Sequence, residues 1–380
     1  MHGARGDAVS LAEHAVLAPS SAYCWVECAG SRALRQAYPE REDTEAAMEG
    51  TAAHWVFTKM FDAKRTDAVK VGDVAPNGVE VTEEMLEGAE MFCDYVGMDH
   101  TGHVEKRVTM TKSVHAANWG TPDFWGMRNG ILRIGDYKFG HRYVEEFENW
   151  QMIDYTAGAI EAVGLDISHD TQIELTIVQP RHYGRTGQVR TWTTSIREIQ
   201  PYIQRLRDAA HSAMLEGAPC LTGEHCQFCS GRHACEAAQR AALAVLEMGG
   251  SSAPLELPVP AAARELASLQ RAASIMDARI TGLVESLLYA GRSGTVIPGY
   301  GVERAEGRQK WIKPVGEVLA LGSMLGIDLS KPSVITPKQS VKKGVPEAVV
   351  ASMSETPLGE WKLVKTDDRK ARKAFGGVAS

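Results

Sequence analysis

The sequence predicts an α/β fold, of the α+β kind, in which helices flank a central mixed sheet. Helical patterns come first, over residues 10–37 and 44–66. A strand follows in HVEKRVTM, and then a β-hairpin in PDFWGMRNGILRIGDYKFG. Further helical and strand patterns alternate after it, which is typical of a sheet covered by helices. These later elements are a helix from about 148, strands at 172–179 and 187–194, and a helix around 196–216.

The hairpin is the best-defined element, because Asn129-Gly130 is a strong signal for a two-residue type I′ turn. With that turn as the loop, the register places Asp123 directly opposite Asp136. Side chains alternate between the two faces, so one apolar face ends in these two carboxylates and Lys138. The cross-strand pairs expected on the way are Arg128 with Ile131, Met127 with Leu132 and Trp125 with Ile134.

Two carboxylates facing each other across a strand pair repel, and burial makes the repulsion worse. A divalent cation between Asp123 and Asp136 would compensate, with Lys138 as a neighbouring positive charge. Mg²⁺ or Mn²⁺ accepts carboxylate, carbonyl and water oxygens, which is what this corner offers. The alternative is that the hairpin ends in solvent and Lys138 neutralises two surface acids.

Two further motifs lie on expected helices. His54 follows Gly50 by four residues in GTAAH, before the hairpin. Gln151 and Tyr155 are also four apart, in ENWQMIDYTAGAIEA, and therefore share one face of a helix. Taken singly, a lone histidine is more often structural than a ligand, and glutamine and tyrosine at helical spacing are a weak signal.

Three of the seven cysteines cluster as Cys226-x2-Cys229-x5-Cys235, in GEHCQFCSGRHAC. Seven cysteines in a chain expected to be cytosolic are not a disulfide framework, so a cluster of three thiols indicates a metal site. A structural zinc site is one reading, because His225 and His233 lie in the same stretch. Cys24, Cys93 and Cys220 are expected to be free thiols, with Cys220 as a substitute ligand.

At 380 residues the chain is too long for one typical compact domain. The segment MGGSSAPLELPVPA is rich in Gly, Ser and Pro and reads as a linker. The expected division is a main domain over 1–247, a linker over 248–261, and a helical and small α/β extension over 262–380.

The extension carries two features that suggest contacts. Its helix has an apolar seam that either packs in the core or pairs with a partner helix, which allows a homo-oligomer. A basic stretch, WKLVKTDDRKARKAF, is either a solvated tail or a nucleic-acid contact. The seam residues are Leu266, Leu269, Ala273, Met276, Ile280, Leu283 and Leu287.

Composition narrows the class of protein. The net charge of −7 argues against a protein that coats nucleic acid generally, but not against a local basic groove. No apolar run is long enough to span a bilayer, and the N-terminus has no secretory h-region. A cytoplasmic protein without a membrane partner is expected.

The motifs GxxxH, GTPD, GDYK and QxxxY, in that order, resemble the RecB-type branch of the PD-(D/E)xK nuclease superfamily. The resemblance covers roughly residues 18–240. It implies a restriction-endonuclease-like core in which His54, Asp123, Asp136 and the carbonyl of Tyr137 bind Mg²⁺ or Mn²⁺. Lys138 would orient or activate the attacking water, while Gln151 and Tyr155 line the site and contact DNA. Glu105, in HVEKRV, could be a further acid near the site, but it is not included in the expected set.

The same resemblance extends to the cysteines. Some RecB-type nucleases carry a [4Fe–4S] cluster whose fourth cysteine lies far upstream, before GxxxH. The family pattern Ser-Ser-x6-Cys-x2-Ser is matched by Ser20, Ser21, Cys28 and Ser31. The resemblance therefore implies an iron–sulfur cluster on Cys28, Cys226, Cys229 and Cys235, with structural zinc as the alternative.

The turn after Lys138, and GYGVERAEGRQKW further on, resemble a phage- and prophage-encoded subgroup of these nucleases. That likeness implies a metal-dependent DNA exonuclease acting on free ends in phage recombination, in the cytoplasm of a bacterial host. A single-strand annealing protein is a plausible partner. Two alternatives remain open: an endonuclease that cuts flaps or branches, and a catalytically weak DNA-binding scaffold.

Overall fold

The computed structural model describes residues 15–39, 45–97, 102–164, 168–184, 186–247 and 257–302, with residues 324, 346 and 348. Contacts divide the chain into two units, Met1–Pro298 and Gly299–Ser380. The predicted linker lies largely outside the described residues, as does the basic stretch near the C-terminus. The first unit extends past the linker and includes the long helix that follows it.

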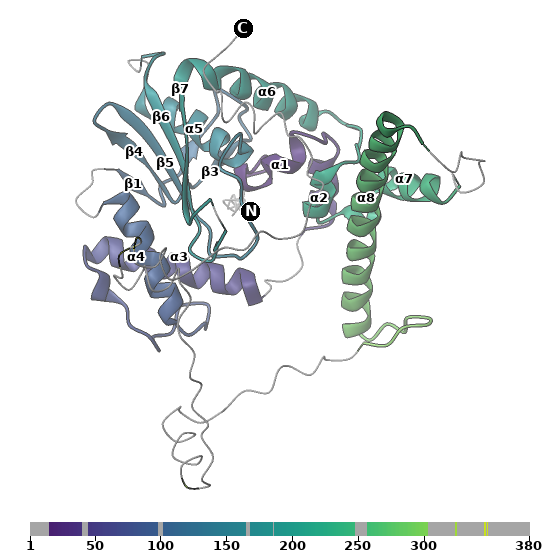
Figure 1. The fold of residues 1–380 in the computed structure, drawn as a ribbon, viewed down its shortest axis with the longest axis horizontal. Coiled ribbons are helices and arrows are strands. Elements are labelled where there is room, and N and C mark those ends of the chain that lie inside the picture. Colours follow the sequence, from purple (N-terminus) through teal and green to yellow (C-terminus); the bar gives the residue numbers. More distant parts are fainter. Residues whose placement is uncertain are drawn as a thin grey trace, which may run out of the picture. The chain divides into compact units, whose positions relative to one another are not determined.

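The first unit is built around a five-stranded mixed sheet with the order β1-β4-β5-β6-β7, and the predicted fold class is confirmed (Figure 1). The β5–β6 pair is parallel, and the other neighbouring pairs are antiparallel. A separate two-stranded sheet pairs β2 with β3. The strands are β1 His103–Val104, β2 Val108–Thr109, β3 Trp119–Gly120, β4 Phe124–Arg128, β5 Ile131–Tyr137, β6 Gln172–Val178 and β7 Val189–Ser195.

The hairpin register is the one that the turn predicts. Arg128 pairs with Ile131, Met127 with Leu132 and Trp125 with Ile134. Asn129 and Gly130 both have positive φ, 52° and 77°, as a type I′ turn requires. The ladder ends at Phe124 and Gly135, one residue before the two aspartates.

The sheet separates two apolar cores. On one face, Leu132 and Ile134 pack with residues of α1, α5 and α6. On the other face, Phe124 and Tyr137 pack with residues of α3 and α4. Successive side chains of a strand point to opposite faces of the sheet, so β5 contributes residues to both cores. The helices are α1 Ala22–Trp25, α2 Ser31–Ala37, α3 Glu45–Ala63, α4 Glu83–Val96, α5 Trp150–Val163 and α6 Ile196–Met214.

Two expected elements are wrong in detail. The helix predicted over 10–37 is interrupted, because α1 ends at Trp25 and α2 begins only at Ser31. Gly30 lies in this break and packs so closely on Cys220 that a Cβ there would be 2.6 Å from its Sγ. The strand predicted in HVEKRVTM is divided into β1 and β2, which belong to different sheets. Glu105, with a φ of 46°, turns the chain between them.

The cysteine stretch and the residues after it form short helices and one long helix. Here α8 contacts α7 and both 3-10 helices of the cysteine stretch. No helix in the described part of the chain meets the length and apolarity needed to cross a bilayer. The elements are η3 Glu224–Phe228, η4 Arg232–Ala234, α7 Glu236–Glu247 and α8 Val259–Arg292.

Candidate metal centre

Asp123 and Asp136 lie together at the end of the hairpin, and both are buried. Asp123 directly precedes β4, and its Oδ2 accepts a hydrogen bond of 2.6 Å from the backbone N–H of Tyr137. Asp136 belongs to β5 and is only 2% exposed. The predicted alternative, two surface acids in solvent, is therefore wrong, because the ends of both strands are covered by helices.

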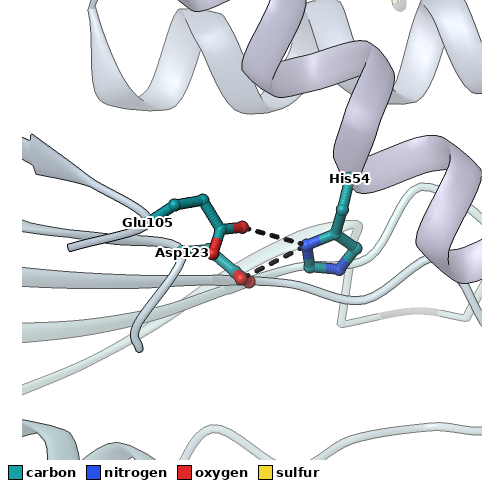
Figure 2. A group of neighbouring side chains, drawn as sticks. All are labelled: His54, Glu105 and Asp123. Carbon is teal, nitrogen blue, oxygen red and sulfur yellow. Dashed lines mark ion pairs between the residues drawn. The ribbon is translucent and has the colours of Figure 1, made fainter. Parts of the chain in front are cut away.

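His54 reaches Asp123 from α3. Its Nδ1 lies 3.2 Å from Asp123 Oδ1 and 3.7 Å from Glu105 Oε1 (Figure 2). One ligand atom from each of the three residues lies within 4.8 Å of the other two. Among the described residues, this is the one group of His, Cys, Asp and Glu side chains that meets this spacing. It is a possible metal site.

Glu105 is the residue that sequence reasoning left out. It lies between β1 and β2, and its backbone N–H donates to the carbonyl oxygen of Asp123 at 3.2 Å. This bond and its left-handed backbone aim the Glu105 side chain at His54 (Figure 2). Positive φ is uncommon for a residue other than glycine and marks a conformation imposed by its surroundings. No residue pattern in the sequence predicts this left-handed turn at Glu105.

Lys138 and Gln151 surround the other aspartate. Lys138 Nζ lies 3.0 Å from Asp136 Oδ2, and it donates to Gln151 Oε1 at 3.2 Å. Gln151 Nε2 contacts Asp136 Oδ1 at 3.3 Å and the hydroxyl of Tyr155 at 3.4 Å. The helix that carries Gln151 and Tyr155 begins at the cap Asn149, whose side chain accepts from the N–H groups of residues 151 and 152.

Gly120, the first residue of GTPD, makes room for this arrangement. A Cβ at that position would lie 2.8 Å from Tyr155 Cε1 and 2.8 Å from Pro19 Cγ. The glycine therefore lets the ring of Tyr155 pack against the segment that leads to Asp123. The predicted residues from four separate motifs thus converge on one place, although a metal-ligand role for the Tyr137 carbonyl stays a prediction.

Neighbouring charges set the protonation of the buried acids. Burial alone would raise the pKa of Asp123, but the charge and hydrogen bond of His54 outweigh it and lower that pKa. Burial raises the pKa of Asp136; the Lys138 ammonium opposes this rise and the Asp123 charge adds to it. Burial lowers the pKa of His54, but Asp123, helped by Glu105, raises it to about 10. A protonated His54 therefore balances Asp123, and a divalent cation bound there would displace that proton.

The site is open on the side of its bases. The side chains of His54 and Lys138 are 31% and 29% exposed, whereas that of Asp136 is 3% exposed. The Glu105 side chain beside them is 35% exposed, so the open side of the site presents a carboxylate as well as the two basic groups.

A family model matches residues 14–371, across both units. The chain belongs to the DUF2800 family. The family is described as "Protein of unknown function", so the match extends over nearly the whole chain without assigning an activity.

The DUF2800 chain also gathers five cysteines around one pocket. The lining includes the four predicted ligands and Cys220, whereas Cys24 instead donates to the carbonyl oxygen of His225 at 3.6 Å. Cys220 thus lies in the same pocket, and its role as a substitute ligand stays a prediction. The predicted ligands Cys28, Cys226, Cys229 and Cys235 are all buried.

Backbone donors point at these sulfur atoms. The N–H of Leu221 donates to Cys28 Sγ at 3.2 Å, and that of Gly223 donates to Cys226 Sγ at 3.4 Å. Such bonds stabilise thiolates and are among the interactions that set the potential of iron–sulfur clusters. Among the described residues, no three of the cysteine sulfurs lie within 4.8 Å of one another. The five cysteines therefore line one pocket, but in the described part of the chain their sulfurs are not placed as the ligands of a single ion.

Proposed function

We propose that this DUF2800 protein is a metal-dependent deoxyribonuclease that hydrolyses phosphodiester bonds at DNA ends. The observation that carries the proposal is the meeting of His54, two buried aspartates and Lys138 where β4 begins and β5 ends. In this proposal His54, Asp123, Asp136 and the carbonyl of Tyr137 hold Mg²⁺ or Mn²⁺. Glu105 adds a carboxylate from the side of His54.

The bound metal would lower the pKa of a water molecule and polarise the scissile phosphate. The residues of the chain supply the remainder. Lys138 is held between Asp136 and Gln151, so its ammonium is fixed before the substrate arrives. A charge placed in advance stabilises the negative charge that develops on the phosphoryl oxygens. Gln151 and Tyr155 form the wall of the site on the α5 side.

The test is a cleavage assay with Mg²⁺ or Mn²⁺ on end-labelled linear duplex, linear single strands, and nicked and closed circles. Wild type is compared with Asp136→Asn, which keeps the shape of the side chain but removes its charge. We expect wild type to degrade linear DNA and leave closed circles intact. The variant should lose at least about 10²-fold in rate, because it lacks a ligand charge and a partner of Lys138.

Each of the other outcomes would assign a different activity to the protein. Cleavage of closed or branched substrates that Asp136→Asn abolishes would replace the exonuclease by a structure-specific endonuclease at the same site. Absence of cleavage on every substrate, with DNA binding retained, would indicate a scaffold and overturn the proposal. Equal cleavage by wild type and variant would place any activity elsewhere.

The second part of the proposal is a [4Fe–4S] cluster on Cys28, Cys226, Cys229 and Cys235. A [4Fe–4S] cluster binds one thiolate at each of its four irons, so its ligand sulfurs lie further apart than those around a single ion. His225 Nε2 lies 3.0 Å from the carbonyl oxygen of Leu221 and donates to it, which leaves Nδ1 as the His225 nitrogen that a zinc ion could use. Structural zinc therefore stays the alternative, and metal analysis distinguishes the two.

Replacing Cys226 by serine is expected to remove the cluster. Protein purified without oxygen should lose its brown colour, its iron and its acid-labile sulfide. Stability should fall on the order of 4–5 kcal/mol, because the cluster closes a very long loop between Cys28 and Cys226. Cys93→Ser, in the core between α3 and α4, is the control and should keep the cluster. Bound zinc in place of iron in wild type would contradict this part.

The resemblance to phage-encoded RecB-type nucleases also suggests a biological role. We propose that the protein processes DNA during phage recombination, in the cytoplasm of a bacterial host, with a single-strand annealing protein as partner. Co-purification of the chain with such a protein, encoded beside it, is the observation that would support this setting.

A further inference from the structure

Helix α8 has two distinct sides. Ile275, Ala278 and Gly282 are its buried residues, and this side packs on the cysteine stretch. At Gly282 a Cβ would lie 2.5 Å from Arg232 Cγ, so the helix approaches the stretch closely. Arg232 also forms an ion pair with Glu285, with Nη2 2.6 Å from Oε2. This anchored side fixes the direction in which the remainder of the helix faces.

The other side carries a heptad repeat. The residues of the predicted seam alternate three and four apart, which is the spacing of the a and d positions of a coiled coil. Ile275, Ala278 and Gly282 then occupy c and f positions, on the side of the helix away from the seam. Extended to both ends, the a positions are Val259, Leu266, Ala273, Ile280 and Leu287, and the d positions are Ala262, Leu269, Met276, Leu283 and Ala290.

The seam is not covered by the described part of the chain. Leu269 is 56% exposed and Ile280 is 54% exposed, and Leu266, Leu283 and Leu287 are each close to 40%. Core packing, one of the two expectations from the sequence, is therefore not seen for these leucines in the described part of the chain. Figure 1 shows α8 beside α7, and the helix continues beyond that contact at both ends. A regular row of exposed leucines and isoleucine indicates an interaction surface.

A helix of this length needs a partner with the same repeat. The 34 residues of α8 extend for about 51 Å. Next to it, α7 has 12 residues. After Pro298, the longest stretch of sequence without glycine or proline is 360–375, which is shorter and strongly basic. The partner that matches the seam in both repeat and length is another copy of α8.

We propose that α8 pairs with α8 of a second copy of this chain to form a two-stranded coiled coil. The interface is isologous, so each a and d side chain of one copy inserts between side chains of the other. Alanine at 262, 273 and 290 lets the helices approach, and the large residues between fill the seam. The cysteine stretch is fixed to the opposite side of α8, so the dimer leaves its pocket unobstructed.

The test measures the mass of the full chain, purified without oxygen, by sedimentation equilibrium over a wide range of concentrations. Wild type should sediment as a dimer, at twice 41.3 kDa. Leu269→Glu and Ile280→Glu, which bury a carboxylate in the seam, should weaken the dimer by at least about 10²-fold. The matched controls Ser268→Glu and Thr281→Glu add the same charge at exposed neighbouring positions outside the seam and should remain dimers. Circular dichroism checks that all four variants fold.

Three results would overturn the proposal. One is a wild-type monomer at every concentration, and another is a dimer that survives both seam substitutions. The third is that the protein is a monomer and that the seam substitutions make residues 299–380 sensitive to proteolysis. That result would mean that the seam packs on the second unit of the same chain. None of these results depends on nuclease activity, so failure here leaves the proposed function unaffected.

Discussion

Replacing Lys138 by methionine is expected to lower the rate of DNA cleavage by about 10²–10³-fold while Mn²⁺ still binds. Methionine has an unbranched side chain, one atom shorter than that of lysine, and carries no charge. The ammonium lies 3.0 Å from Asp136 and is not among the proposed ligands, so the oxygen atoms proposed to bind the metal are retained. Loss of a positive charge beside them should leave the affinity for the cation unchanged or higher. Mn²⁺ binding is measured by titration calorimetry or by electron paramagnetic resonance.

The contrast with the ligands makes this test specific. Asp123→Asn should reduce both binding and cleavage, because it removes a carboxylate that also orders the Tyr137 N–H. Lys59→Met, at an exposed position of α3, is the matched control and should change neither. Loss of Mn²⁺ binding in Lys138→Met would show that the lysine maintains the shape of the site rather than acting on substrate. An unchanged cleavage rate would remove Lys138 from the chemistry.

The stability of the protein is expected to fall as pH rises toward 8, because of one buried acid on α5. Burial raises the pKa of Asp154 to about 8, and a hydrogen bond from Asn118 opposes the rise only in part. Asn118 Nδ2 donates to Asp154 Oδ2 at 2.9 Å, whereas Oδ1 of each residue has no hydrogen-bond partner among the described residues. A proton on Asp154 removes the charge of this buried carboxyl, while the bond from Asn118 still joins α5 to the segment before β3.

The direction in which the free energy of unfolding changes with pH follows from proton binding. Between the unfolded pKa of 3.8 and the folded pKa of about 8, the folded state holds a proton that the unfolded state has lost. Each pH unit in this window therefore lowers the free energy of unfolding by about 1.4 kcal/mol. The loss reaches on the order of 5 kcal/mol above pH 8.

Asp154→Asn imitates the protonated acid and should be free of this loss. Urea unfolding of wild type and variant, measured at several values between pH 5 and pH 9, gives the difference due to this residue. The advantage of the variant should be small near pH 5, about 1–2 kcal/mol, and should grow to about 5 kcal/mol at pH 8.5. Parallel curves across the range would mean that Asp154 is ionised throughout. Groups that titrate in both proteins, such as His54, cancel in the difference.

The sequence by itself determined the hairpin and much of the candidate site. Asn129-Gly130 accepts positive φ at both positions, so local sterics fixed the turn, and the turn fixed the register. Once the register is known, alternation of side chains places Asp136 and Lys138 on the same face. The four-residue spacing of Gln151 and Tyr155 was equally local, because one turn of helix relates them.

Only the tertiary structure decided which residues complete these local patterns. Glu105 joins the site because a left-handed turn between two sheets aims it at His54, and no periodic signal encodes such a turn. Cys220 lies in the cysteine pocket because Gly30 allows the two segments to touch. The heptad seam of α8 could be predicted from the sequence, but its exposure depends on which side of the helix packs on the cysteine stretch. In each case the deciding contact joins residues far apart in the chain, and it depends on packing rather than on local backbone preference.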